Sequence, residues 1–328
     1  MRDIETRART HRWRRRLGGL TAAGVAAALL VACSGPGSGT TPSNGSSGAS
    51  YSLVGGDKVA AIAASGSMPA IGTEGDSIVG FEAPLFTTAM QRLGLDYDVT
   101  WADFAGGLAA IQAGRNDMMI GSIAWSASRA QTGLFTDPIY YVPTVFAEKK
   151  GAGIKTIEGL SGHRIGTVTG YYFIQTLQGM PGVDLQVYPD IATTLADLDA
   201  GRIDVALLDA TVMVYTAKTR PDLDIEAVVA DPPTAEQLAA HPEWESLGPI
   251  MAEWYLPKGE EALRDALNGV IREMYQDGTI EDALKQYGFE DPSEWLTLDD
   301  FWHDKLQQQR RDADRPSDWT LPALGAAK

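Results

Sequence analysis

Residues 113–129 read AGRNDMMIGSIAWSASR, an order of residue types that indicates a helix end, a buried strand and the start of a new helix. Gly114 can adopt the left-handed backbone that ends a helix. The apolar run at 118–120 is short enough for a central parallel strand. Ser126 is a good N-cap, and it leaves free backbone N–H groups in the same first helical turn as Arg129. A cation at this place favours a small anion, and a carboxylate is the obvious candidate.

The same pattern occurs a second time, 87 positions further along the chain. The segment LAAIQAGRND at 108–117 is echoed by LADLDAGRID at 195–204, and an apolar strand, at 118–120 or 205–208, follows each copy. This spacing is too long for a solenoid repeat but suits two similar α/β lobes. A coincidental match is the alternative, and the length and order of the matching run argue against it.

Five stretches occur in an order that is typical of one family: VGFE at 79–82, residues 108–117, SASR at 126–129, FTDPIYY at 135–141 and residues 200–209. On these stretches the chain, from about residue 56 to residue 290, resembles the extracellular solute-binding proteins of the polar amino-acid class. The resemblance implies a two-lobed type II periplasmic-binding-protein fold, in which each lobe is a doubly wound, mainly parallel α/β sheet. It also implies a monomer that captures an amino acid or a related small zwitterion and delivers it to the permease subunits of an ABC importer.

Strands and helices alternate along both halves, which places a ligand at the carboxyl ends of the parallel strands. We expect the chain to cross between the lobes near 145–148 and 228–231, so that lobe 1 comprises residues 56–146 and 231–290 and lobe 2 residues 147–230. Two extended crossings form a hinge, and closure of the lobes around a ligand is the expected motion.

Residues 291–328 lie beyond the family pattern. Within them TLDD at 297–300 resembles a capping box that opens a helix with Phe301, Trp302 and Leu306. The aromatic residues of this extension either pack onto lobe 1 or form a contact surface for a partner protein, and the sequence leaves both roles open.

The first 33 residues have the pattern of a lipoprotein signal peptide. Arginines at 12 and 14–16 precede an apolar run at 20–32 that is too short for a mature membrane helix, and LVAC at 30–33 resembles a lipobox. We therefore expect Cys33, the only cysteine, to carry a lipid on the outer face of the cell membrane. Ordinary secretory cleavage, with Cys33 incidental, is the alternative. Residues 34–55, mostly Gly, Ser, Thr and Pro, are expected to be a flexible tether.

Charge and motif content exclude several classes of protein. Seven arginines and two acids lie in the first 33 residues, so the rest carries 20 basic and 41 acidic residues, a net charge of −21. This acidity argues against binding to nucleic acid or to anionic lipid by charge. The histidines at 163, 241 and 303 lack metal-ligand spacing, and the sequence has no nucleophile elbow or phosphate-binding loop. We therefore expect no catalytic residue, metal or other cofactor.

The resemblance implies that Arg129 holds the α-carboxylate of an amino acid, with help from groups at Gly121, Ser122 and Ala124. A planar guanidinium suits a carboxylate because the two form parallel hydrogen bonds; an arginine on a helix surface is the alternative. Ala124 replaces a polar residue that is often found in the family, which removes one expected carboxylate contact. The resemblance also implies that Asp209, at the end of a strand in lobe 2, receives the α-ammonium group. The alternative role of Asp209 is to cap the next helix.

Aromatic residues are expected to enclose the ligand. Phe104 matches a position whose ring stacks on the ligand, but SMPAI at 67–71 has no ring where relatives carry one. In lobe 2 this chain has Tyr171 and Tyr172 where relatives have small hydroxyl residues. These phenols, and Trp125, either bound the pocket or belong only to the core. The sequence therefore leaves open whether the ligand is a common amino acid or a different molecule.

A secreted enzyme on the same scaffold, a cyclohexadienyl or prephenate-type dehydratase, is the second hypothesis. Such an enzyme needs a positioned acid beside its ligand. Glu74, Asp76 and Glu82 are the acids nearest to the expected mouth, and none lies in a recognisable catalytic pattern. The predicted lipid anchor and tether favour capture for transport.

Overall fold

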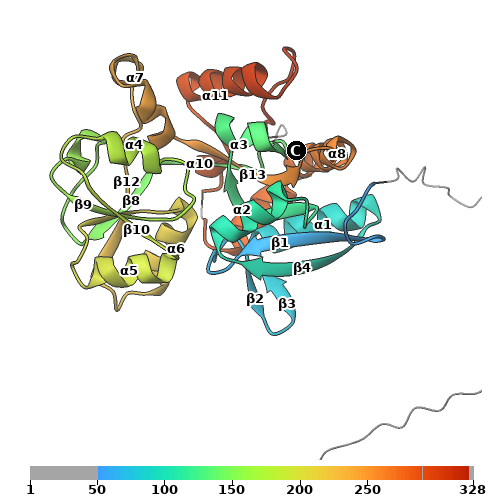
Figure 1. Ribbon diagram of the computed structural model, residues 1–328, viewed down its shortest axis with the longest axis horizontal. Coiled ribbons are helices and arrows are strands. Elements are labelled where there is room, and N and C mark those ends of the chain that lie inside the picture. Colours follow the sequence, from blue (N-terminus) through green and yellow to red (C-terminus); the bar gives the residue numbers. More distant parts are fainter. Residues whose placement is uncertain (1–50, 290, 325–328) are drawn as a thin grey trace, which may run out of the picture. The chain divides into compact units, whose positions relative to one another are not determined.

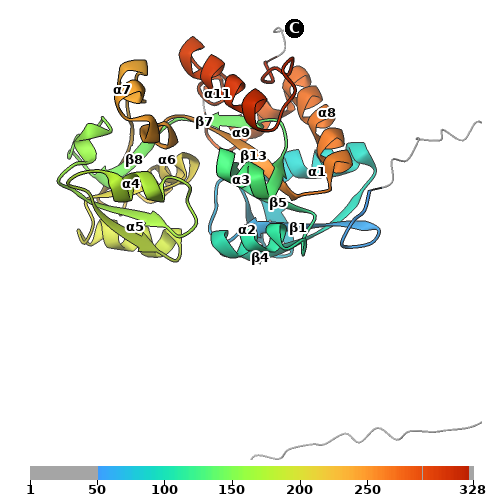
Figure 2. The same ribbon diagram turned by 45° about the horizontal axis from the view of Figure 1, so that its top comes forward.

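The computed structural model describes residues 51–289 and 291–324, which belong to the compact unit Ala49–Lys328. The predicted signal peptide, Cys33 and most of the predicted tether lie outside the described residues. In the described part, helices surround two larger β-sheets and one small hairpin (Figures 1 and 2). None of its helices combines the length and the apolar character that a membrane crossing requires.

The first sheet has the strand order β4 (Asp96–Ala102), β1 (Lys58–Ala64), β5 (Met118–Ala124), β13 (Ile250–Pro257) and β6 (Gly133–Phe135), and β7 (Tyr140–Val142) also pairs with β13. β1 is parallel to β4 and β5, whereas β13 is antiparallel to β5, β6 and β7. The hairpin of β2 (Gly72–Glu74) and β3 (Ser77–Val79) follows β1 in the chain.

The second sheet has the order β10 (Asp184–Tyr188), β9 (Arg164–Val168), β11 (Val205–Leu207), β8 (Val145–Lys149) and β12 (Ile225–Val229). β9 is parallel to β10 and β11, and β8 is antiparallel to β11 and β12. Each sheet therefore has a parallel part of three strands, as the sequence predicts. The antiparallel strands β7, β8 and β13 are those that adjoin the passages between the sheets.

Helices cover both sheets. We call the first sheet with its helices the first lobe; these helices are α1 (Glu82–Leu93), α2 (Phe104–Gln112), α3 (Ala127–Thr132), α8 (Glu261–Asp277), α9 (Thr279–Gln286), α10 (Ser293–Leu296) and α11 (Asp300–Ala313). We call the second sheet with its helices the second lobe; these are α4 (Ile174–Gly179), α5 (Ile191–Asp199), α6 (Ala210–Thr219) and α7 (Ala235–Ala240), with the 3₁₀ turns η1 (Glu158–Leu160) and η2 (Pro242–Leu247).

The core of the first lobe lies on both faces of its sheet. Successive side chains of a strand point to opposite faces, and β1 shows this alternation. Val59 and Ala61 belong to one buried cluster together with Phe86 of α1 and Leu267 of α8. Ile62 belongs to a second cluster that contains residues of α2. Because both faces are covered, the strand is apolar almost throughout.

The two copies of the repeated segment fold in the same way. Each is a helix that ends at a glycine with a left-handed backbone, Gly114 at φ 62° and Gly201 at φ 70°, followed by a parallel strand. Asp117 accepts a hydrogen bond from the Ala60 N–H at 2.7 Å, and Asp204 accepts one from the Arg164 N–H at 2.8 Å. Each aspartate thus ties its strand to the neighbouring parallel strand.

The chain passes between the lobes twice. The first crossing comprises residues 143 and 144, between β7 and β8, and the return crossing lies between η2 and β13. The Thr144 hydroxyl donates to the Leu247 carbonyl at 2.6 Å, which joins the two crossings. β8 pairs within the second sheet, and Thr176 of α4 donates to the Glu243 carbonyl in η2 at 3.0 Å. These contacts associate residues 145–146 and 235–247 with the second lobe, beyond the predicted boundaries at 146 and 231.

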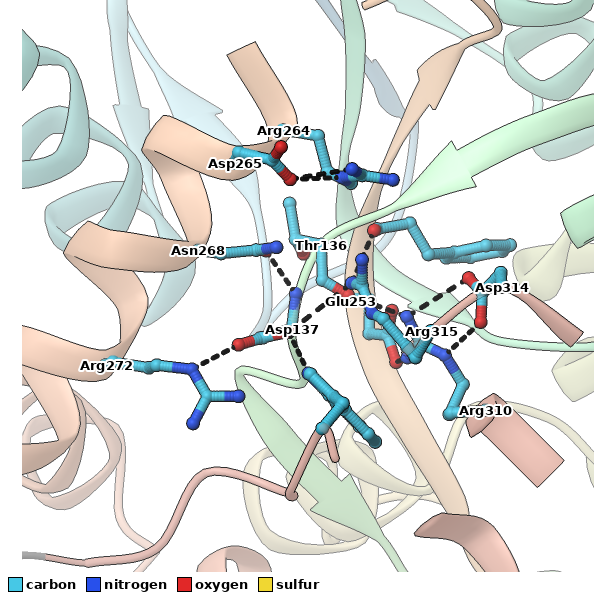
Figure 3. Close-up of polar contacts among 12 residues, drawn as sticks. Thr136, Asp137, Glu253, Arg264, Asp265, Asn268, Arg272, Arg310, Asp314 and Arg315 are labelled. Atoms are coloured by element: carbon cyan, nitrogen blue, oxygen red, sulfur yellow. Dashed lines mark hydrogen bonds and ion pairs between the residues drawn. The ribbon is translucent and has the colours of Figure 1, made fainter. Parts of the chain in front are cut away.

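The segment after residue 290 packs against the first lobe. Asp299 is the N-cap of α11 and accepts from the Trp302 N–H at 2.8 Å, so the expected capping box does not begin at Thr297. Figure 3 shows Arg310 between Glu253 of β13 and Asp314. Trp302 is 1 % exposed, which favours the packing role for the aromatic residues of this segment.

Candidate functional site

A cavity of about 80 Å³ lies between the two lobes, at the carboxyl ends of β5 and β11. Eight of the nine residues predicted to bind a ligand line it: Phe104, Gly121, Ser122, Ala124, Arg129, Tyr171, Tyr172 and Asp209. Both crossings also contribute walls, through Val142–Val145 and through Ser246, Leu247, Gly248 and Ile250. These wall residues were not predicted from the sequence, although the extended crossings expected at the hinge were a signal for them.

Arg129 is a buried cation that faces this cavity. Ser126 caps α3 by accepting from the Arg129 N–H at 3.3 Å, and this turn directs the side chain inward. The guanidinium donates to the Ala124 carbonyl at 2.7 Å and, across the lobes, to the Gly170 carbonyl at 2.9 Å. Within the described residues it forms no ion pair with a carboxylate. Burial lowers the pKa of Arg129 to about 10, because loss of water disfavours the charged form.

Aromatic rings from both lobes surround the guanidinium. Its central carbon lies 5.2 Å from the centre of the Phe104 ring and 5.6 Å from that of Tyr172. Phe104 also meets Tyr171 edge to face, with ring centres 5.1 Å apart, in a contact that crosses from α2 to the second lobe. A Cβ at Gly170 would lie 3.5 Å from Phe104, and its φ of 91° also favours glycine. The rings therefore exclude water from the charge.

A buried carboxylate shapes the backbone of the first-lobe wall. Glu82 accepts from the Gly121 N–H at 2.9 Å and from the Ser122 N–H at 2.7 Å. Ser122 has a left-handed backbone, φ 61°, which a non-glycine residue adopts only when its surroundings hold it there. Gly121 has φ 102°, and a Cβ there would meet Ile71 at 2.5 Å. Glu82 thus holds the turn that presents the Ser122 hydroxyl to the cavity.

Glu82 does not line the cavity itself. Its remaining hydrogen bonds come from the Tyr140 hydroxyl at 2.8 Å and the Trp254 indole N–H at 3.0 Å. Burial raises the pKa of Glu82, and the four donors oppose that rise. Glu74 and Asp76 lie in the exposed β2–β3 hairpin. None of the three acids considered for a catalytic role therefore contacts the cavity.

Asp209 has two roles in the structure. It caps α6, accepting from the Thr211 N–H at 2.8 Å through one carboxylate oxygen, which is the capping role that the sequence left open. Its other oxygen faces the cavity and accepts from the Ser122 hydroxyl of the first lobe. Within the described residues Asp209 forms no ion pair, so the second lobe presents an uncompensated negative charge to the cavity.

Trp125 is the one predicted ligand-binding residue that does not line this cavity. Its side chain is 7 % exposed and borders a separate cavity beside α11, with its ring 5.4 Å from the Arg310 guanidinium. A contact with a segment 185 residues later could not be foreseen from the neighbours of Trp125 in the sequence. No group of three or more potential metal ligands occurs in the described ranges, 51–289 and 291–324.

The chain matches a known family over most of its length. The family described as bacterial extracellular solute-binding proteins, family 3, matches residues 61–290. The L-cystine-binding protein TcyJ of Escherichia coli K12 is 28 % identical over 229 residues, covering 68 % of this chain and 80 % of its own length. The probable amino-acid-binding protein YxeM of Bacillus subtilis 168 is 25 % identical over 272 residues, covering 81 % of this chain and 94 % of its own length.

Solved structures have the same fold. The crystal structure of the substrate binding protein of an amino acid ABC transporter superposes with a TM-score of 0.59 at 24 % identity, covering 70 % of this chain and 99 % of that protein. The predicted two-lobed α/β fold of the periplasmic binding proteins is therefore confirmed.

Proposed function

Because the chain belongs to family 3 of the bacterial extracellular solute-binding proteins, we propose that it captures an amino acid or a related zwitterion for an ABC importer. Its relative TcyJ is an L-cystine-binding protein, and YxeM is a probable amino-acid-binding protein. The similar crystal structure is that of the substrate binding protein of an amino acid ABC transporter, which supports transfer of the ligand to permease subunits. In this proposal the protein is a monomer whose two lobes, joined by the crossing at residues 143–144 and by the return crossing between η2 and β13, close on the ligand.

One observation carries the proposal: a buried arginine from one lobe and a half-buried aspartate from the other face the same cavity, and neither forms an ion pair within the described residues. Arg129 comes from the first lobe and Asp209 from the second. A charge that is removed wholly or partly from water and lacks a partner is costly, so each group favours a ligand that supplies the opposite charge. A zwitterion satisfies both at once. Arg129 would hold its carboxylate through two parallel hydrogen bonds, and Asp209 would accept from its ammonium group.

The other predicted residues have supporting roles in this proposal. Gly121 and Ser122 supply the polar edge of the first-lobe wall, and Ala124 leaves its carbonyl to orient Arg129. Phe104 and the two tyrosines close the site from opposite sides. A ligand that binds to the first lobe would replace the Arg129 contact to Gly170, and the second lobe would then close on it.

We also propose that the protein is a lipoprotein. Cys33, after removal of the signal peptide, would carry the lipid, and residues 34–55 would tether the folded part to the outer face of the membrane. The location outside the cytoplasm agrees with the extracellular solute-binding family. A Cys33→Ser variant tests the anchor by membrane fractionation. The variant should be lost from the membrane fraction, whereas the unchanged protein should stay in it.

An enzyme on the same scaffold is the weaker alternative. An acid catalyst must lie within hydrogen-bond reach of its substrate, and Glu74, Asp76 and Glu82 all lie away from the cavity. Asp209 is the acidic residue that does reach it, and it is engaged with Thr211 and Ser122. This arrangement suits the holding of a charge.

Thermal unfolding of residues 34–328 against a panel of amino acids, betaines, small peptides and aromatic acids tests the proposal. A ligand that binds only the folded state adds about 2.7 kcal/mol of stability at 100 times its dissociation constant. We expect a raised midpoint with at least one zwitterion and unchanged ligand after several hours. A panel without any shift would contradict capture of amino acids, and turnover of the ligand would support the enzyme.

The Arg129→Ala variant tests the assigned anchor. Its affinity for the ligand should fall by about 2–5 kcal/mol, measured by calorimetry, because the ligand carboxylate stays buried without its partner. Arg115→Ala is the matched control, since Arg115 is exposed at the end of the preceding helix. Equal affinity of the Arg129→Ala variant and the unchanged protein would refute the assignment.

A further inference from the structure

We propose that the ligand is an α-amino acid with a compact, uncharged and mainly apolar side chain, of the size range from alanine to leucine. This inference rests on the proposed function and adds the class of side chain to it. It follows from what lines the cavity beyond the two charged anchors and from how little space the second lobe leaves.

The α-carboxylate and the α-ammonium group of an amino acid match both charges of the cavity lining. Among the described residues that line the cavity, Arg129 and Asp209 are the only charged ones. One carboxylate and one ammonium group therefore neutralise the site. A charged side chain would add a third charge without a partner in a water-poor space, where an uncompensated ion is strongly disfavoured. Lysine, arginine, aspartate and glutamate are excluded on this ground.

The remaining walls favour an apolar side chain. The crossings contribute Val142, Val145, Leu247 and Ile250, and the start of α6 contributes Val212. Apolar walls of this kind bind a side chain by removing its CH₂ groups from water. Hydroxyl groups in the lining are few and belong to serine and threonine residues, apart from the phenols.

Two tyrosines limit the length of the side chain. Tyr171 and Tyr172 enter from the second lobe, and Tyr171 closes on Phe104 of the first lobe in an edge-to-face contact. The cavity that they leave, about 80 Å³, is roughly half of the 150 Å³ that holds benzene in an engineered core. The contacts of Arg129 with Gly170 and of Ser122 with Asp209 would yield to the charged groups of the ligand, which leaves this space for the side chain. A long side chain does not fit there while the Phe104–Tyr171 contact persists.

Calorimetric titration of residues 34–328 with single amino acids tests the inference. The panel contains glycine, alanine, valine and leucine on one side, and lysine, arginine, glutamate and cystine on the other. We expect a member of the first group to bind at least about 100-fold more tightly than every member of the second. Equal or tighter binding of a charged amino acid or of cystine overturns the inference while the proposed function stands. Absence of binding by any amino acid overturns both.

The Tyr171→Ala variant tests the size limit. It removes the ring that meets Phe104, so the ratio of phenylalanine affinity to alanine affinity should rise by about tenfold or more. Tyr215→Ala is the control, because Tyr215 is a half-buried tyrosine of the same lobe that does not line the cavity. The unfolding midpoint of each variant shows that it is folded. An unchanged ratio in folded Tyr171→Ala would refute the role of this ring.

Discussion

Replacement of Arg310 by methionine should reveal how firmly the C-terminal segment is joined to the first lobe. Arg310 is completely buried and forms an ion pair with Glu253 of β13, while Asp314 accepts from its Nε at 2.8 Å and the Thr136 carbonyl accepts from its Nη2 at 3.2 Å. Figure 3 shows these side chains meeting between β13 and the C-terminal segment. Methionine replaces the aliphatic part of the arginine side chain and carries no charge.

The expected cost is about 3–5 kcal/mol of unfolding free energy. Removal of one partner from a buried ion pair leaves the other charge in the protein interior without compensation. Glu253 is 1 % exposed, and one of its carboxylate oxygens already has no hydrogen-bond partner. The double variant Arg310→Met with Glu253→Gln should recover a large part of the loss, because the stranded charge is then absent.

The loss should also depend on pH in a defined direction. Burial raises the pKa of Glu253, while Arg310 and Arg315 oppose the rise; without Arg310 the pKa rises further. The folded variant then keeps the proton at pH values where the unfolded chain has lost it, so its stability falls as the pH rises above the ordinary pKa of glutamate. Urea unfolding should therefore give a larger deficit at pH 8 than at pH 5. A deficit under about 1 kcal/mol, or one independent of pH, would refute the reasoning.

Three further predictions concern the site and the C-terminal segment. Arg129→Ala should keep or raise the unfolding free energy, by up to about 3 kcal/mol, since it removes a buried cation whose pKa burial has lowered to about 10; thermal unfolding without ligand measures this, and a large loss would make Arg129 structural. Glu82→Gln places an amide NH₂ group opposite N–H groups that now donate to the carboxylate. The unfolding free energy, measured in urea, and the ligand affinity, measured by calorimetry, should each fall by about 1–3 kcal/mol. Unchanged values would argue that Glu82 does not hold the turn at Ser122. A chain that ends at residue 290 should lose more stability than Arg310→Met, because it also loses the buried Trp302, and a smaller loss would contradict the packing role.

The sequence predicts those parts of the molecule that depend on neighbours along the chain. The repeated helix, glycine and strand are local patterns, so Gly114, Gly201 and the strands after them could be placed correctly. Arg129 could be directed to the cavity for the same reason, because a helix cap three residues earlier fixes its turn. Asp209 follows from its place at the end of a strand.

Contacts between distant segments are the part that the sequence does not predict. Glu82 was considered as a catalytic acid, and its actual partners include two amides 39 and 40 residues away. The apolar walls at Val142 and Ile250 face the cavity because two crossings about 100 residues apart lie together, which follows from the pairing of both sheets. Packing of this kind depends on shape in three dimensions, and residue type alone does not specify it.

The C-terminal segment and the cavity meet at the return crossing. Gly248 lines the cavity, and a Cβ there would overlap the Trp302 ring, so the crossing runs directly against α11. Gln309 and Lys305 of α11 both contact Glu245, just before this point. Since α11 is also anchored on β13, it fixes one wall of the cavity relative to the first sheet. The family match ends at residue 290, yet the element that holds this wall lies beyond it, so one wall of the cavity is held by a segment that the family pattern does not define.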